Sequence, residues 1–221
     1  MQTDTINHEQ KRIELASELR SKGITDENVL QAIEKVPRHL FFPKDDILSQ
    51  NNIYENVAMP IGGGATISRP FVGAFQAELL RIKPKDKALE IGTGSGYLAA
   101  LLCEMGATVY TIEILHPIFE YAKTNLHSTG YNKVSCYRKD GYGGLAIEAP
   151  FDKIIVTVCL TELPRELLKQ LKVGGLIVLP FGTTTNCQLI RLTKKAEDQY
   201  GEEEVWDGFA FANIDRETIY P

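Results

Sequence analysis

The sequence of 221 residues contains no long apolar run and no excess of basic residues. No stretch approaches the ~20 apolar residues that a membrane-spanning helix needs. The polar start MQTDTINHEQKRIELASELR lacks the apolar core of a signal peptide. The net charge of -5 disfavours binding to a phosphate backbone, and the scattered aromatic residues form no platform for stacking bases. We therefore predict partners other than membranes and nucleic acids.

Disulfide and metal-binding patterns are also missing. The four cysteines (Cys103, Cys136, Cys159 and Cys187) are far apart and form no CxxC motif. Because each lies in an apolar run, we predict buried, reduced thiols with a structural role, which suits the cytoplasm. The histidines show no metal-ligand spacing, so we predict no metal, and we expect His39 to be structural.

The first third of the chain predicts helices and one long loop. Hydrophobic residues make up 43% of the sequence, enough for the core of one sizeable domain. Apolar spacing predicts helices over 8–23, over 26–36 with Asp26 as N-cap and Pro37 after its end, and over 71–80. We expect residues 37–70 to be irregular, and loops of that length are usually functional.

The rest of the chain alternates between strands and helices. Apolar strands are predicted over 87–91, 108–114, 133–140, 151–160 and 176–182, with helices over 96–106, 117–130 and 163–175 and two closing strands over 187–194 and 204–214. Continuous apolar strands separated by helices predict a mostly parallel sheet covered on both faces, which is an α/β fold.

A glycine loop follows the first of these strands. In LEIGTGSGY, residues 89–97, Gly92, Gly94 and Gly96 would let a ligand touch the backbone. Tyr97 occupies the position where a dinucleotide-binding loop has its third glycine. Glu90 would repel a pyrophosphate and attract a cation such as the sulfonium or ammonium of S-adenosylmethionine. This pattern favours that cofactor over a nicotinamide dinucleotide or a turn without a ligand.

Two further acids are predicted at the same edge of the sheet. Glu113 ends the second strand, 21 residues after Gly92, where a carboxylate can accept hydrogen bonds from ribose hydroxyls. Asp140, followed by Gly141, ends the third strand and could accept from an adenine amino group. Alone, these residues could be a solvated carboxylate and a turn. Since parallel strands end at one edge, one ligand could contact both acids and Glu90. We add two neighbours, Thr93 and Ile114, to the predicted cofactor site.

The stretch GGGATISRP, residues 62–70, places three glycines before a stiff segment. By itself, ATIS could be a plain edge strand and Ser68 a surface hydroxyl. Other motifs favour a functional role for this segment. Together with it, the chain resembles protein-L-isoaspartate O-methyltransferases in the motifs IGGGATIS, LEIGTGSGY, DGYGG, APFDKIIVT and LKVGGLIVLPFG. The early RSKGITDENVLQAIEKVPRHLFF also resembles that family, and the likeness runs over roughly residues 10–182.

The resemblance implies a fold. It implies a Rossmann-like S-adenosylmethionine-dependent methyltransferase with a mostly parallel seven-stranded sheet between helices and an N-terminal helical extension. We expect a single domain over residues 1–221, and we predict a monomer. Residues 1–80 would form the N-terminal helices and the substrate and cofactor loop, 81–182 the cofactor-binding core, and 183–221 the closing strands.

The resemblance also implies an activity. Members of this family methylate the free α-carboxylate of L-isoaspartyl residues in damaged proteins, which starts repair through a succinimide. Ser68 matches the family's active-site serine, and Ala65, Thr66 and Ile67 match the segment that lines cofactor and substrate. A carboxylate with a pKa near ~3.5 is already ionised at neutral pH, so the reaction needs alignment rather than a base.

Two segments and one single residue depart from the family's pattern. Residues 158–161 read VCLT instead of small-Ala-Pro, residues 211–214 read FANI instead of an aromatic-Val-Pro-Leu segment, and Lys139 replaces a common glycine. The first two changes should lie near the acceptor, so the acceptor preference could differ. The alternatives are a methyltransferase of the same fold for another carboxylate or a small molecule, and a nonenzymatic cofactor-binding or interaction protein.

Overall fold

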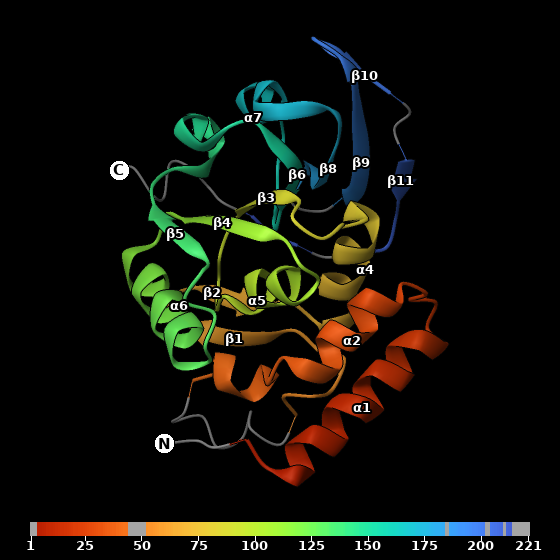
Figure 1. Cartoon of the computed structure of the whole chain (residues 1–221), viewed down its shortest axis with the longest axis vertical. Coiled ribbons are helices and arrows are strands. Elements are labelled where there is room, and N and C mark those ends of the chain that lie inside the picture. The colour runs from red at the N-terminus through yellow and green to blue at the C-terminus, as the bar shows by residue number, and fades with distance from the viewer. Residues whose placement is uncertain (1–3, 44–51, 184–185, 202–203, 210, 214–221) are drawn as a thin grey trace.

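A computed structural model describes residues 4–43, 52–183, 186–201, 204–209 and 211–213. Its centre is an eight-stranded sheet in the order β10-β9-β8-β6-β3-β4-β5, with β11 paired to β9, where seven strands were predicted (Figure 1). Neighbours from β8 to β5 are parallel, and β9 is antiparallel to β8, β10 and β11. The strands are β3 (Lys87–Ile91), β4 (Thr108–Glu113), β5 (Ser135–Arg138), β6 (Phe151–Val156), β8 (Leu171–Thr183), β9 (Asn186–Ala196), β10 (Gln199–Tyr200) and β11 (Glu204–Trp206).

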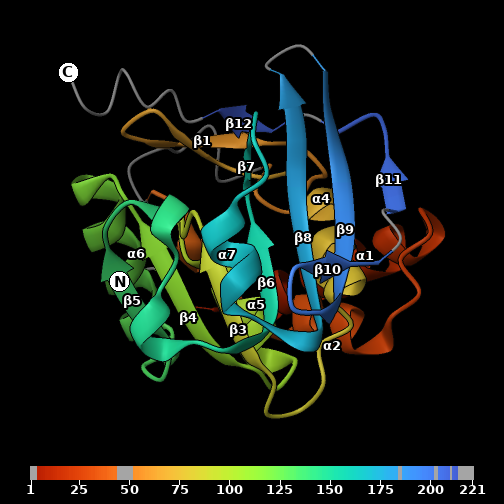
Figure 2. The same cartoon turned by 90° about the horizontal axis from the view of Figure 1, so that it is seen from above.

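Helices cover both faces of the sheet, as the continuous apolar strands predict. Because side chains alternate along a strand, Ala88 and Val109 enter one hydrophobic cluster, whereas Leu89 and Ile112 enter another on the opposite face. Figure 2 shows α7 in front of the strands, with α4 and α5 behind them. The flanking helices are α4 (Pro70–Leu80), α5 (Tyr97–Glu104), α6 (His116–Ser128) and α7 (Arg165–Gln170).

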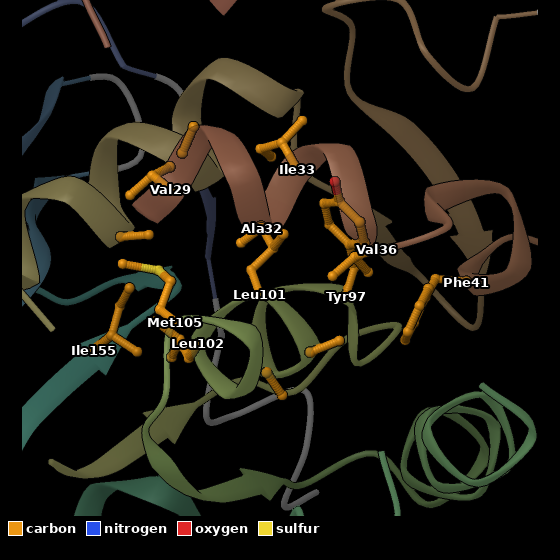
Figure 3. Close-up of a cluster of buried hydrophobic side chains, with 14 of the residues drawn as sticks. Val29, Ala32, Ile33, Val36, Phe41, Tyr97, Leu101, Leu102, Met105 and Ile155 are labelled. Atoms are coloured by element: carbon orange, nitrogen blue, oxygen red, sulfur yellow. The ribbon is translucent and has the colours of Figure 1, made fainter. Parts of the chain in front are cut away.

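The N-terminal helices form an extra layer behind the sheet. They are α1 (Ile6–Ser21) and α2 (Glu27–Lys35), and the Asp26 carboxylate caps α2 by accepting from the Asn28 N–H at 2.8 Å, as predicted. Figure 3 shows Val29 and Ile33 of α2 near Leu101 of α5. These side chains are at most 1% exposed, so the extension belongs to the same core as the sheet. No helix of the described residues is long and apolar enough to cross a bilayer.

Four predicted segments differ from the structure. The closing strand predicted over 204–214 is divided between β11, in the central sheet, and β12 (Ala212–Asn213), in a separate two-stranded sheet. The region 37–70 contains a 3-10 helix, η1 (Arg38–Phe41), and a hairpin of β1 (Met59–Gly62) and β2 (Ala65–Ile67). The predicted strand 151–160 is interrupted at Thr157, whose hydroxyl donates to the Ile91 and Gly92 carbonyls, and it resumes as β7 (Val158–Cys159). The predicted helix 163–175 is only α7, because Leu171 already pairs with β6.

The prediction of four reduced cysteines is wrong for two of them. Cys159 and Cys187 form a disulfide, while Cys103 and Cys136 are free. The two bonded cysteines are 28 residues apart in sequence. They meet because β7 follows β6, and Cys187 lies at the start of β9, beside the end of β8. Sequence spacing alone does not reveal this pairing, since it depends on strand order.

Candidate active site

The sheet order places a ligand-binding crevice at the carboxyl ends of β3 and β6. The chain passes from β3 to β4 and β5 on one side, and then returns to β6 on the other side of β3. In open α/β sheets, ligands bind where the strand order reverses in this way. The glycine loop follows β3 at this point, and Thr157 follows β6.

Close packing requires glycine at two positions of this loop. Gly92 has φ +94°, and a Cβ there would lie 2.3 Å from the Thr157 hydroxyl oxygen. Gly96 has φ +88°, and a Cβ would lie 2.9 Å from the Leu126 side chain. The amides of Gly92 and Thr93 both donate to the Ile112 carbonyl, at 2.9 and 3.2 Å. The loop is therefore held against β4 and β6 by its own backbone.

Glu90 lies beneath the loop with no exposed surface. Its Oε2 accepts from the Thr111 hydroxyl at 2.6 Å, and that hydroxyl also contacts the Thr93 hydroxyl at 2.6 Å. Its Oε1 is buried and has no hydrogen-bond partner among the described residues. Burial raises the pKa of Glu90 to about 8, Glu113 adds to the rise, and Thr111 opposes it. A cation beside this carboxyl group would favour its ionised form.

The Glu113 carboxylate accepts hydrogen bonds from main-chain N–H groups at the end of β4. Its Oε2 accepts from the Gly94 N–H at 3.0 Å, and its Oε1 accepts from the N–H groups of Ile114 and Leu115 at 2.9 and 3.0 Å. These bonds fix the carboxylate against the glycine loop at only 7% exposure. The predicted acid at this strand end is therefore held in one orientation by the backbone around it.

Asp140 lies at the third strand end, as the sequence predicts. Its Oδ1 accepts from the Tyr142 N–H at 2.9 Å, which caps the 3-10 helix η2 (Gly141–Gly143). A Cβ at Gly141 would lie 2.4 Å from the Ile91 side chain, so glycine allows this turn to approach β3. The turn predicted from the Asp-Gly pair is present, and it faces the same edge of the sheet as Glu113.

Nearly all residues predicted for the site line two neighbouring cavities. A large cavity of about 1170 Å³ is lined by residues of the hairpin and the glycine loop, and a small one of about 30 Å³ is lined by Asp140 and apolar side chains. Both are lined by Gly92, Glu113, Ile114 and Val158, so they adjoin. The predicted residues that line one or both are Ala65, Thr66, Ile67, Ser68, Glu90, Gly92, Thr93, Gly94, Glu113, Ile114, Asp140 and Gly141. The remaining predicted residue, Gly96, lines neither cavity and packs against α6.

Ser68 follows a hairpin that reaches across the edge of the sheet. The turn uses Gly62, Gly63 and Gly64, all with φ between +58° and +90°, so the glycines predicted to give freedom form a defined turn. A Cβ at Gly63 would lie 3.0 Å from Ile118, which places the tip against α6. Ser68 is half-buried and lines the large cavity. ATIS is thus largely a strand that also forms a cavity wall.

The composition of the cavity walls fits S-adenosylmethionine. The buried Oε1 of Glu90 offers an unpartnered acceptor to a cation, and Glu113 and Asp140 offer further acceptors. The small cavity has apolar walls that include Ile91, Ile112 and Leu167, which suit the faces of a flat heterocycle, but its volume of about 30 Å³ is that of about one water molecule, so these walls must move apart to admit a ring. The large cavity is lined by Glu90 and Glu113 and also by Arg38 and Arg69, so its walls carry charges of both signs, and the carboxylates suit the cationic part of a ligand.

Sequence reasoning missed several residues of the site. Arg38 is 1% exposed and lines the large cavity, although the sequence drew attention only to its neighbour His39. Thr157 holds the glycine loop through its hydroxyl, and Asn56 accepts from the Phe71 N–H at 2.9 Å at the start of α4. A side chain that bonds to the backbone of a distant segment leaves no periodic signal, so only the fold reveals these roles.

Two departures from the family pattern lie side by side. β7 pairs in parallel with β12 (Ala212–Asn213), with Ala212 opposite Val158. Val158 and Phe211 both line the large cavity, and Leu160 lines the small one. Ile214 lies outside the described residues. The altered residues therefore meet at the cavity wall, where the sequence analysis expected the acceptor.

The structure also gathers Asp4, His8 and His39, a group that sequence spacing did not reveal. Their potential ligand atoms lie within 4.8 Å of one another. Arg12 donates to both oxygens of the Asp4 carboxylate, at 2.7 and 2.9 Å, and the two histidine rings stack with centroids 3.8 Å apart. His39 is 1% exposed and hydrogen-bonds with Tyr54 at 2.6 Å, consistent with the structural role that was predicted for it.

Comparisons with known proteins show which family this chain resembles. A relative from Christiangramia forsetii, a protein-L-isoaspartate O-methyltransferase, is 46% identical over 195 residues, which cover 88% of this chain and 90% of the relative. A relative of the same description from Dictyoglomus thermophilum is 44% identical over 199 residues, covering 90% and 89% of the two chains.

Solved structures give the same result. One protein-L-isoaspartate O-methyltransferase superimposes with a TM-score of 0.83 at 28% identity, covering 92% of this chain and 66% of its own. The fold is also shared with a β-aspartate methyltransferase from Plasmodium falciparum, solved with S-adenosyl-L-homocysteine, with a TM-score of 0.79 at 22% identity over 93% and 98% of the chains. The family model of protein-L-isoaspartate(D-aspartate) O-methyltransferase matches residues 10–216, and the chain therefore belongs to that family.

Proposed function

We propose that this chain transfers a methyl group from S-adenosylmethionine to the free α-carboxylate of L-isoaspartyl residues, the reaction of its family. The observation that carries the proposal is the meeting of three acids and the Ser68 segment around two adjoining cavities. Methylation turns the carboxylate into a better leaving group, so that the succinimide reforms and hydrolyses partly to normal aspartate. The substrates would be proteins and peptides that carry this damage.

We propose that the three acids and the glycine loop bind the cofactor. S-adenosylmethionine supplies a methyl group on a positively charged sulfur. Glu90 offers a buried oxygen to the cationic part of the cofactor, and Glu113 accepts from its ribose hydroxyls. Asp140 accepts from the adenine amino group at the wall of the small cavity. The amides of the glycine loop allow close contact, because Gly92 and Gly94 carry no side chain.

Ser68 orients the acceptor in this proposal. The acceptor carboxylate is ionised at neutral pH and needs no general base. Its oxygen must face the methyl carbon in line with the sulfur, at about 3 Å. The Ser68 hydroxyl donates to one carboxylate oxygen, and Ala65, Thr66 and Ile67 line the path of the cofactor and substrate. Fixed donors of this kind lower the barrier by excluding misaligned poses.

We further propose that residues 1–221 act as one monomeric methyltransferase domain in the cytoplasm. The large cavity is lined by Ser68 from the first segment, by Glu90 from the core and by Phe211 from the closing segment, which supports the single domain. The Cys159–Cys187 disulfide does not support the location, since disulfides are rare in reducing compartments.

A second candidate is a carboxyl methyltransferase with a different acceptor. Val158 and Phe211, which belong to the two segments that depart from the family pattern, both line the large cavity, and this observation favours it. The cofactor residues would keep the roles described above. Only the group bound between the Ser68 segment and the β7–β12 pair would change.

A pair of peptides distinguishes these functions. An isoaspartyl peptide and its normal aspartyl twin are incubated with the protein and methyl-labelled S-adenosylmethionine, and label is counted in each peptide. We expect incorporation into the isoaspartyl peptide alone, and a loss of about 100-fold or more with Ser68→Ala. Ser128→Ala, at the end of α6, is the matched control and should retain activity. Equal labelling of the two peptides, or none, would remove the repair assignment.

A further inference from the structure

Arg38 joins three separate segments of the active site. Its Nε donates to the Ile53 carbonyl at 2.9 Å, and its Nη2 donates to the Ser68 carbonyl at 2.8 Å. The guanidinium carbon lies 4.8 Å from the ring centre of Tyr97, the residue that begins α5 directly after the glycine loop. One side chain therefore contacts the Ser68 segment and the helix that continues the glycine loop.

The environment of this arginine is unusual for a buried cation. It is 1% exposed, and it forms no ion pair with a carboxylate among the residues that the structure describes. Arg12 provides the comparison, because it is also buried, at 5% exposure, but pairs with Asp4. A buried charge without an acid is costly. The guanidinium donates to two carbonyls and lies over an aromatic ring. Lysine cannot make these contacts together, because its ammonium group lacks the planar fork of donors, so an arginine is required here.

The bond to the Ser68 carbonyl acts on the Ser68 hydroxyl through the backbone. Ser68 lies between β2 and the start of α4 at Pro70, and both flanking elements are regular. A carbonyl held at 2.8 Å fixes the orientation of the adjoining peptide plane, and with it the direction of the Ser68 Cβ. The Tyr97 ring fixes the other end of the guanidinium. Arg38 thus links the backbone at Ser68 to the ring of Tyr97, which directly follows the glycine loop.

We propose that Arg38 is a positioning residue for methyl transfer, which holds the Ser68 segment at a fixed distance from the glycine loop. This role rests on the proposed function. It assigns Arg38 no contact with the acceptor, and it depends on the geometry of the fork rather than on the positive charge. Two variants separate these properties: Arg38→Lys keeps the charge without the fork, and Arg38→Gln keeps a planar donor without the charge.

The kinetic test compares kcat and KM for the isoaspartyl peptide. We expect Arg38→Lys and Arg38→Gln to lower kcat by about 10- to 100-fold, the effect of a misplacement near 1 Å. KM for the peptide and the Kd for S-adenosylhomocysteine should stay within about threefold, because neither ligand loses a contact. Arg12→Lys controls for the loss of a buried arginine and should leave kcat near the wild-type value. If Arg38→Lys keeps its kcat while Arg38→Gln raises KM, the charge matters and the proposal is wrong.

Amide hydrogen exchange tests the same idea without turnover. We expect the N–H groups of residues 65–69 to exchange at least about tenfold faster in both Arg38 variants than in the wild type, and unchanged in Arg12→Lys. Unchanged exchange in that segment would overturn the positioning role even if activity fell. If the wild type methylates no isoaspartyl peptide, the proposed function fails, and the exchange measurement still decides whether Arg38 holds the Ser68 segment.

Discussion

Replacing Glu90 by glutamine should change how stability depends on pH. Burial raises the pKa of Glu90 from 4.5 to about 8 in the folded protein. In the unfolded chain this carboxyl group ionises near its ordinary value. Between these two pH values the unfolded state releases a proton that the folded state keeps, so the free energy of unfolding of the wild type falls as pH rises. Below pH 4.5 and above pH 8 this contribution is constant.

The size of the effect follows from the pKa difference. Each unit corresponds to about 1.4 kcal/mol, so the contribution lost between pH 4.5 and pH 8 is at most about 5 kcal/mol. Glutamine does not titrate, and its amide oxygen can keep the hydrogen bond from Thr111. A constant cost of about 1–3 kcal/mol for its buried NH2 group does not alter the slope. Relative to the wild type, Glu90→Gln should gain about 1.4 kcal/mol in stability per pH unit over this range.

Urea denaturation followed by circular dichroism measures this difference. Both proteins are unfolded at pH 5, 6, 7, 8 and 9 without added cofactor, and the difference in free energy of unfolding is plotted against pH. A rise from pH 5 to 8 and a plateau above pH 8 are expected. A difference that stays level from pH 5 to 8 would show that the folded protein holds Glu90 ionised, and the reasoning about its burial would be refuted.

Two further outcomes follow from the loop and the disulfide. Gly92→Ala should cost about 2–3 kcal/mol and abolish S-adenosylhomocysteine binding in calorimetry, since its Cβ would lie 2.3 Å from the Thr157 hydroxyl. Gly130→Ala, with φ +89° and no neighbour within 4 Å, should cost less and keep binding; equal losses would contradict the steric argument. Reduction of the Cys159–Cys187 disulfide should lower stability by about 3–4 kcal/mol for its 28-residue separation. Thiol titration of the unfolded protein should find two thiols before reduction and four after it, and four without reductant would contradict the pairing.

The convergence of the acids could be predicted from the sequence, whereas the contacts that hold the site could not. Glu90 and Glu113 lie in the last two residues of β3 and β4, Asp140 follows β5, and parallel strands end at one edge, so pattern alone places them together. Arg38 could not be predicted, because nothing local distinguishes a buried arginine from an exposed one. The meeting of Cys159 with Cys187 likewise depends on the pairing of β8 with β9. The proposed role of each site residue stays a prediction until it is tested.

The walls of the large cavity come from three distant lengths of sequence, represented by Ser68, Glu90 and Phe211. No continuous fragment of the chain contains the complete site unless it spans nearly the whole of it. A chain truncated after residue 200 would lack Gly208 and Phe211 while keeping the parallel strands. We expect such a truncated protein still to bind the methyl donor, but to leave it open to solvent on the side where these two residues line the cavity.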